Sequence, residues 1–294
     1  MIRAAVSAIA LGCAGRASSV PPAAPAEASL SLAADERMID IPAGRYVAGS
    51  TPEERATAYD NFRDTTGSDT ARAERWFERE ADRHSATLPA FRIDLMPVTQ
   101  AQFAEFVVAE RAAPPAIDEA AWQAEGMTGD FASFAPRLVW RDGRPPSSRE
   151  DHPVVAVAWA EAERYCRWRG GQRGQPRRLP TADELEKAAR GDGGMAYPWG
   201  NLYEPDKLNS AVRGPGDTTP VGNYPAGASP YGVLDLAGNV YHWTTTPGGP
   251  GERVIKGSAW RDFGGLGRGA WFDRRAAAAG HVVVGFRCAA DAPP

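Results

Sequence analysis

Apolar and polar residues alternate over short stretches of this chain, and turn residues interrupt them every few positions. Met38–Ile41 and the residues after the turn at Pro42–Gly44 predict two short strands, and Phe91–Asp94 predicts a third. Further short strands are expected at residues 138–140, 152–157, 253–256 and 282–287. From Tyr197 onward the pattern is mostly that of loops, and no internal repeat is visible.

Helical periodicity appears in a few segments of the same chain. Capping boxes, in which two side chains satisfy free N–H groups of a first turn, are predicted at Thr99–Gln102 and Thr181–Glu184. Another helix is expected over residues 158–168. An amphipathic helix is expected around residues 71–81, inside a polar segment at 51–84 that we interpret as an insertion.

Composition narrows the classes of protein to consider. The 294 residues are 43% hydrophobic and 24% charged, which suits a globular core and argues against a wholly disordered chain. The net charge of −4 lacks the basic excess of nucleic-acid binders, so no nucleic-acid partner is expected. No apolar run approaches the roughly 20 residues that span a bilayer. With 31 Gly, 25 Pro and 9 Trp, a turn-rich fold filled by aromatic side chains is expected.

The N-terminus has the pattern of a secretory signal: one cation, a short apolar run at Ala4–Leu11, then small residues. Ala10–Cys13 is similar to the cleavage box of bacterial lipoproteins, which favours residues 1–13 as a signal peptide and lipidation of Cys13; an ordinary cleaved signal is the alternative. Residues 14–36 are rich in Ala, Ser and Pro and predict a disordered tether. We therefore expect a periplasmic or outer-membrane lipoprotein, held to the membrane by its lipid alone.

The other two cysteines are Cys166 and Cys288. In an oxidising compartment they are expected to form a disulfide, and the alternative is a pair of buried thiols. The chain-entropy model gives at most roughly 4 to 5 kcal/mol for closing so long a loop.

A series of motifs follows in fixed order through the second half of the chain. They are His152–Trp159, Tyr165–Trp168, Arg178–Thr181 with Glu184, Tyr197–Asn201, Pro220–Gly222, Tyr231–Val240 with Trp243, Lys256–Ser258 and Gly285–Cys288. Together they resemble the formylglycine-generating enzyme family, also called the sulfatase-modifying factor domain. The resemblance implies one α+β domain over residues 37–291, with little regular secondary structure and a topology related to C-type lectins. It also implies a Cys166–Cys288 disulfide.

The catalytic cysteines of that family are missing. The resemblance places two copper-binding cysteines at Arg261 and near Leu266, where soft thiolates would hold Cu(I). Neither position is Cys, so formylglycine generation is disfavoured and no copper site is expected. The chain has four histidines and no room for the helical iron-binding domain of other relatives, so no iron site is expected either.

Calcium is the cofactor that the resemblance leaves open. It implies two loops whose oxygen atoms bind structural calcium, as a hard cation requires. The first loop contributes Asn209, Ser210 and Asp217, with Thr219; the second contributes Asp235, Gly238, Val240 and His242. His242 stands where the family has Glu, which removes a charged ligand from the second site. Hydrogen-bonded turns without a metal are the alternative.

The resemblance also places a groove. Its expected lining is Trp243, Ser258, Trp260, Arg261, Asp262 and Arg274, with Arg268 and Arg287 nearby in the sequence. Aromatic rings with arginines suit an extended peptide, a glycan or an anionic small molecule. The alternative is that the tryptophans belong to the core and that Arg287 pairs with a buried carboxylate, which for Arg287 is the favoured interpretation.

Two functions from different classes follow. The first is a pseudoenzyme, a non-catalytic binding or scaffolding module in the cell envelope, whose partner is an envelope protein, peptide or glycan. The alternative is a periplasmic enzyme doing other chemistry, such as metabolite or siderophore tailoring, with Asp262 or His242 as acid or base. Convergence of those two side chains with an arginine in a closed pocket would favour the enzyme.

Overall fold

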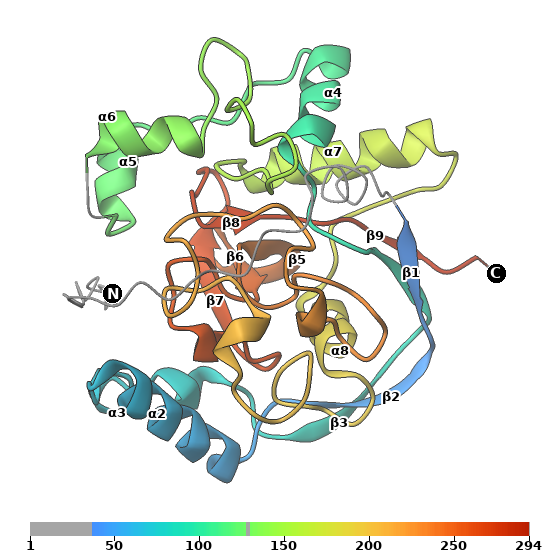
Figure 1. The fold of residues 1–294 in the computed structure, drawn as a ribbon. Coiled ribbons are helices and arrows are strands. Elements are labelled where there is room, and N and C mark those ends of the chain that lie inside the picture. Colours follow the sequence, from blue (N-terminus) through green and yellow to red (C-terminus); the bar gives the residue numbers. More distant parts are fainter. Residues whose placement is uncertain (1–36, 128–129, 294) are drawn as a thin grey trace.

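A four-stranded sheet lies at the centre of the molecule (Figure 1). Its strands are β5 (Tyr241–Gly249), β6 (Glu252–Lys256), β7 (Phe272–Ala276) and β8 (Val284–Gly285), in the order β7-β6-β5-β8. The first three are antiparallel neighbours, and β8 runs parallel to β5. This computed structural model describes residues 37–127 and 130–293, so the expected signal and tether lie outside the described residues.

Two smaller antiparallel sheets complete the strand content of the described chain. β4 (Phe91–Asp94) pairs on one side with β1 (Met38–Ile41) and on the other with β9 (Ala289–Asp291). β2 (Gly44–Ala48) pairs with β3 (His84–Leu88). Because β1 and β9 flank the same strand, the two ends of the domain meet in one sheet. The strands predicted at 38–41, at 91–94 and after the first turn are confirmed.

The helices with predicted capping boxes are present. α4 (Gln100–Glu110) and α8 (Ala182–Arg190) begin after Thr99 and Thr181, whose hydroxyls accept the expected backbone hydrogen bonds. α7 (Trp159–Gln172) confirms the helix expected over 158–168 and extends four residues further. α8 packs between β2 and the central sheet, whereas α4 packs against α7.

The polar segment after β2 folds differently from its prediction. Its main helix is α2 (Pro52–Thr66), followed by the short α3 (Thr70–Ala73) and a 3₁₀ turn at Trp76–Arg79, so the single helix expected around 71–81 is wrong. The amphipathic signal of α2 is weak because its buried face is narrow and includes a charged residue. That face consists of Arg55, Ala58, Tyr59 and Phe62.

The stretch between α4 and α7 contains short helical turns: α5 (Glu119–Ala124), α6 (Phe131–Phe134) and a 3₁₀ turn at Ala135–Arg137. The strand predicted at 138–140 is therefore wrong. Residues 152–157 also lack a strand: residues 153–157 are buried, Ala156 has a φ of 59°, and Val154 N–H donates to the Val98 carbonyl.

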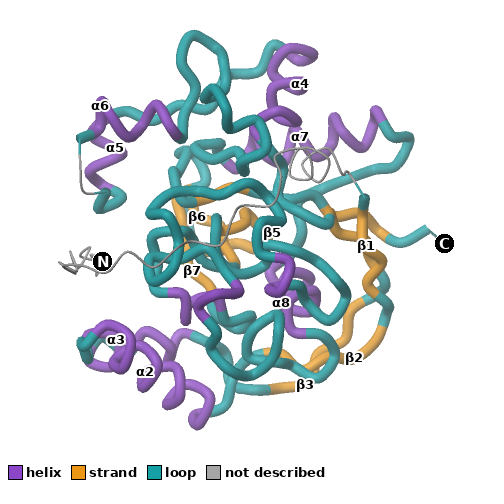
Figure 2. Tube along the Cα trace, in the orientation of Figure 1, coloured by secondary structure: helices purple, strands orange, loops and turns teal. Residues whose placement is uncertain are grey.

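Loops dominate the second half of the chain, as its turn-rich pattern indicates (Figure 2). Three 3₁₀ turns interrupt them, at Pro205–Lys207, Pro225–Gly227 and Gly264–Gly267. Of the strands predicted there, the one at 253–256 is confirmed, and the one at 282–287 is reduced to the two residues of β8. β5 and β7 escaped prediction because Pro, Gly and charged residues break their alternation.

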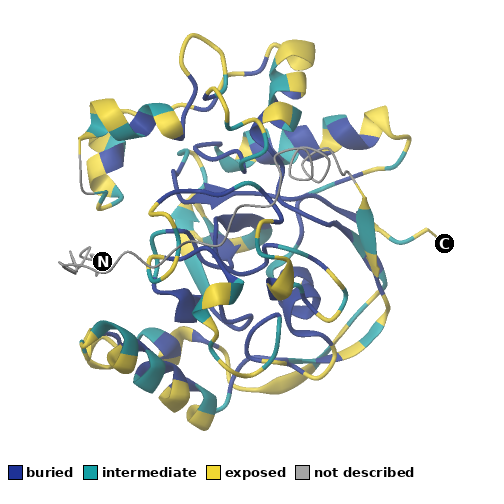
Figure 3. Cartoon of the chain, in the orientation of Figure 1, coloured by how far each residue is buried: buried dark blue, intermediate teal, exposed yellow. Residues whose placement is uncertain are grey.

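The core runs through the centre of the molecule, whereas α2, α4 and α5 expose their outer faces (Figure 3). One large cluster of buried side chains joins α2, α4, α7 and the central sheet. Phe62 of α2 contacts Phe263 edge-on at 5.2 Å, so the polar segment contributes to this same core. Within the described residues, no helix combines the length and apolar character needed to cross a membrane.

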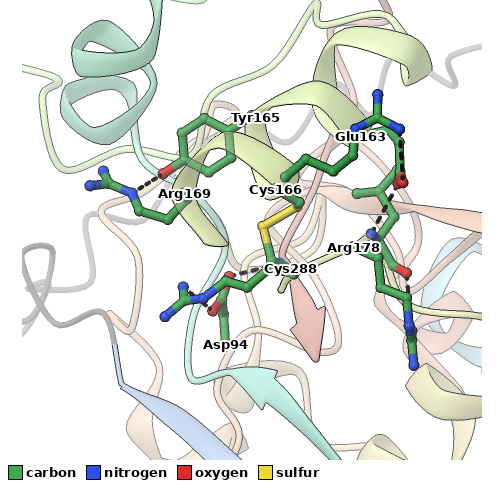
Figure 4. Close-up of a disulfide and its surroundings, with 10 residues drawn as sticks. Asp94, Glu163, Tyr165, Cys166, Arg169, Arg178 and Cys288 are labelled. Carbon is green, nitrogen blue, oxygen red and sulfur yellow. Dashed lines mark hydrogen bonds and ion pairs between the residues drawn. A yellow bond between two sulfur atoms is a disulfide. The ribbon is translucent and has the colours of Figure 1, made fainter. Parts of the chain in front are cut away.

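The predicted disulfide joins Cys166 of α7 to Cys288, next to β9 (Figure 4). Both cysteines are fully buried. The Cys288 N–H donates to the carboxylate of Asp94 at 2.7 Å, which fixes this junction to β4. The bond links a helix of the large core to the sheet that carries the chain ends, and the fold as a whole is a single α+β domain.

Candidate functional site

The central strand β5 sets the floor of the expected groove. Alternation along the strand places Tyr241 and Trp243 on one face and His242 on the other. Trp243 is fully buried, its indole N–H donates to the Val157 carbonyl at 2.9 Å, and its ring meets that of His281 edge-on at 5.6 Å. Trp243 is therefore a core residue here.

The loop after β6 forms one wall of this region. Gly257 has a φ of 92°, a conformation that glycine adopts without strain, and it turns the chain toward Ser258. The Ser258 hydroxyl accepts a hydrogen bond from Gly238 N–H at 2.9 Å, and Trp260 N–H donates to the Asn239 carbonyl at 2.9 Å. These contacts hold the loop against the 235–240 turn.

Aromatic side chains from the stretch between α4 and α7 lie over Trp260. Phe134 of α6 stacks on the Trp260 ring with centroids 5.7 Å apart, and Trp122 of α5 packs against Phe134 at 5.5 Å. Trp122 and Trp260 are only 1% and 5% exposed. Residues 119–127 and 130–137, here named the covering segment, thus bury Trp260, one of the side chains expected to line an open groove.

Arg261 fastens this covering segment to the loop. Its guanidinium donates to the carbonyls of Glu125 and Gly126 at 3.0 and 2.9 Å, and it also contacts the sulfur of Met127 at 2.7 Å. Carbonyls at the end of a helix have no partner within the helix, and a cation is favoured there. Arg261, which stands at the expected copper-ligand position, therefore holds the covering segment in place.

A second contact fixes the same end of α5. The Glu125 carboxylate lies 2.8 Å from Nδ1 of His281, whose Nε2 lies 3.0 Å from the Ala276 carbonyl. The other carboxylate oxygen of Glu125 is buried and has no hydrogen-bond partner within the described structure. Sequence reasoning missed the covering segment altogether, because neither α5 nor α6 shows enough periodicity to be recognised.

Asp262 and His242 do not form an acid–base pair in the described structure. Asp262 accepts the Ala259 N–H at 2.9 Å, and burial raises the pKa of its carboxyl. His242 lies on the face of β5 opposite Trp243, and its Nε2 atom is 2.8 Å from the Asp235 carbonyl oxygen. Burial and the neighbouring Arg287 hold the pKa of His242 well below its ordinary value. The convergence that would favour an enzyme is not found among the described residues.

The arginines expected near the groove are dispersed. Arg274 is exposed on β7 and pairs in register with Val254, so it lies on the face of the sheet opposite Trp243. Arg268 forms a buried two-point ion pair with Glu80, at 2.8 and 3.1 Å.

Arg287 is fully buried and donates to the carbonyls of Asp94, Leu95, Leu234 and Asp235. Its role is structural, as favoured from the sequence. These hydrogen bonds go to backbone carbonyls, and the charges of Asp235 and Asp94 act on the guanidinium without a direct bond to a carboxylate in the described structure. A small cavity of about 10 Å³ adjoins His242 and Lys256. It lies on the His242 side of β5 and not at the expected groove. Among the described residues, no three His, Cys, Asp or Glu side chains are grouped to hold a metal.

The residues expected to bind calcium lie in two buried turns. Asn209 and Asp217 meet in the first, where the Asn209 amide donates to the Asp217 carbonyl at 2.8 Å. The turn from Asp235 to Val240 forms the second, with Asp235 and Asn239 at positive φ. Gly238 approaches the Asn209 backbone so closely that a Cβ atom there would lie 2.6 Å from the Asn209 carbonyl oxygen. The two turns therefore pack directly against each other.

Comparison with known proteins identifies the domain. The model of the sulfatase-modifying factor enzyme 1-like domain matches residues 26–292. The chain belongs to this family. Inactive C-alpha-formylglycine-generating enzyme 2 of Mus musculus is 31% identical over 79% of this chain and 77% of its own. The formylglycine-generating enzyme of Mycobacterium tuberculosis is 31% identical over 74% of this chain and 76% of its own.

A solved structure shows the same fold. PvdO from Pseudomonas aeruginosa superimposes with a TM-score of 0.61, over 87% of this chain and 94% of its own, at 21% identity. The sulfatase-modifying factor fold explains why so few regular elements suffice here. Long loops are held by buried hydrogen bonds and ion pairs, such as the pair of Arg268 with Glu80 at 2.8 Å.

Proposed function

We propose that this chain is an exported, lipid-anchored protein that uses its sulfatase-modifying factor domain as a non-catalytic binding or scaffolding module in the cell envelope. The observation that carries the proposal is the side chain of Arg261. It stands at the expected position of a copper-binding cysteine, and its guanidinium is engaged by the carbonyls of Glu125 and Gly126. An arginine cannot supply the thiolate that Cu(I) chemistry requires.

The thiols of the chain support the same proposal. Cys166 and Cys288 are joined to each other, and Cys13 is the residue expected to carry the lipid. No cysteine is then left for oxidation of a substrate thiol. A relative named as an inactive formylglycine-generating enzyme, 31% identical to this chain, fits a domain kept for binding. An envelope protein, a peptide or a glycan remains the proposed class of partner.

The alternative, a periplasmic enzyme with another chemistry, is less well supported. It has Asp262 or His242 as acid or base, and the convergence that would favour it is not found among the described residues: Asp262 accepts the Ala259 N–H, whereas Nε2 of His242 lies against the Asp235 carbonyl. The groove residues Trp243 and Trp260 are buried as well. These features favour binding through the outer surface of the domain over turnover inside it.

A peptide assay tests the loss of catalysis. Purified full-length protein, supplied with copper, reductant and oxygen, is incubated with a peptide that carries the cysteine of a sulfatase motif. We expect mass spectrometry to recover the cysteine unchanged, because no thiolate pair is available to bind Cu(I). The Mycobacterium tuberculosis relative serves as the positive control. Conversion of the cysteine to an aldehyde by this protein would overturn the proposal.

A further inference from the structure

The turn from Asn209 to Thr219 contains the residues at which the family resemblance implies a structural calcium ion. Several of its oxygen atoms lie close to the Asn209 side chain. The amide nitrogen of Asn209 donates to the Asp217 carbonyl oxygen at 2.8 Å and to the Thr219 hydroxyl at 3.4 Å. The Asn209 side-chain oxygen is buried and has no hydrogen-bond partner in the described structure. The backbone and amide groups of an oxygen-lined turn are therefore in place.

The carboxylate of Asp217, by contrast, is already neutralised by the protein. Its Oδ2 atom lies 2.5 Å from a guanidinium nitrogen of Arg137 and 2.6 Å from one of Arg149. Its Oδ1 atom accepts the Thr218 N–H at 2.7 Å, and the side chain is 2% exposed. Calcium binds hard oxygen ligands and needs the carboxylate as its charged donor. This donor set does not fit an ion unless both arginines leave.

We propose that Arg137 and Arg149 take the place of a divalent cation in this turn. Two guanidinium groups carry the two positive charges that the ion would bring. A carboxylate as deeply buried as Asp217 is strongly destabilising without a partner, so some cation must be present. Guanidinium groups suit this role because they remain charged and donate several hydrogen bonds in a fixed plane.

The neighbouring turn follows the same principle. Arg287 donates to the carbonyls of Leu234 and Asp235 at 2.8 Å each. His242, which replaces the expected glutamate ligand, directs Nε2 at the same Asp235 carbonyl. In each turn an arginine side chain thus contacts a residue that the resemblance assigns to an ion, the carboxylate of Asp217 in the first turn and the backbone carbonyl of Asp235 in the second.

The substitution links the turn to the groove. Arg137 ends the covering segment, directly after α6, and Arg149 lies on the stretch that leads to residues 152–157. Asp217 therefore takes one of its two positively charged partners from the end of the covering segment. The covering segment and the turn stabilise each other without any bound ion.

Melting temperatures in calcium and in chelator test this proposal. For the wild-type protein we expect millimolar calcium and EGTA to give the same value, and terbium, a luminescent substitute for calcium, to show no saturable binding. The double variant Arg137→Gln, Arg149→Gln should melt lower in EGTA and recover by at least about 3 °C in calcium, because the ion then binds only the folded state.

Matched variants separate this result from general damage. Adding Asp217→Asn to the double variant should abolish the calcium response. Arg141→Gln, on an arginine whose guanidinium donates to the Ala132 carbonyl and not to Asp217 in the described structure, should behave like wild type. Calcium stabilisation or terbium binding in the wild type would overturn the proposal, even if the double variant fails to fold. A folded double variant without a calcium response would overturn it too.

Discussion

Single charged side chains set the stability of this domain because many of them are buried. His152, which is partly buried, shows how the surroundings act on a titrating group. Its Nδ1 lies 2.8 Å from the Thr218 hydroxyl, beside the turn that holds Asp217. Burial, with the nearby positive charge of Arg149, lowers the pKa of His152 to about 4. The imidazole is therefore neutral in the folded protein at pH values where it is partly charged in the unfolded chain.

The pH dependence follows from that difference. Between the ordinary pKa of 6.5 and about 4, the unfolded chain binds the proton more readily, so His152 lowers the stability as the pH falls through this window. We expect the effect of this group to amount to about 1–3 kcal/mol by pH 4. Urea denaturation at several pH values should show a shallower pH dependence for His152→Gln than for wild type. An NMR titration midpoint of His152 near 6.5 would contradict this expectation.

At the scale of elements, the covering segment is the part whose order depends most on a few contacts. α5 has six residues, too short to be stable alone, and α6 has four. The stack of Phe134 on Trp260 and the clamp of Arg261 supply what the helices lack. Local opening of such a segment should cost less than global unfolding.

Removal of the clamp tests this dependence. In Arg261→Ala, residues 119–127 should exchange their amide hydrogens faster, because two hydrogen bonds to the guanidinium are lost, worth about 1–2 kcal/mol in local stability. Hydrogen-exchange mass spectrometry should show little change in the central sheet. Arg274→Ala, on an exposed arginine of β7, is the control and should leave the exchange of the covering segment unaltered. Equal exchange in both variants would show that Arg261 does not hold the cover.

At the scale of the whole molecule, the Cys166–Cys288 disulfide joins parts of the chain 122 residues apart. It couples α7, which packs in the large core, to the sheet formed by both ends of the domain. A bond of this kind stabilises mainly by restricting the unfolded chain. It also agrees with the proposed export, because such bonds persist in oxidising compartments.

The redox state of the protein in the cell tests this connection. The full-length chain purified from its membrane fraction should lack free thiols and should carry a lipid on a mature N-terminus at Cys13. A version beginning at Arg37 and kept in a reducing cytoplasm should have Cys166 and Cys288 reduced. It should be less stable to urea by up to about 4 kcal/mol, the loop-closure value for a loop of this length. A mature N-terminus downstream of Cys13 would contradict lipid anchoring, and equal stability of the two forms would contradict the role of the disulfide.

The sequence by itself determined the family, the α+β class, the capped starts of α4 and α8, the disulfide pair and the absence of the copper cysteines. These features depend on residue identity and local spacing, which the chain displays directly. The extents of α2 and β5 and the irregular path of residues 152–157 depended on packing, because partners far along the chain satisfy their backbone groups.

Only the tertiary structure decided how the expected site is used. Arg261, Arg137 and Arg149 look like ordinary surface arginines in a chain rich in them. Their roles depend on the folded arrangement, which brings the end of α5 to the loop after β6 and residues 137 and 149 to Asp217. Long-range electrostatic partners leave no local pattern in a sequence, and so the closure of the groove and the neutralisation of Asp217 could be found only in three dimensions.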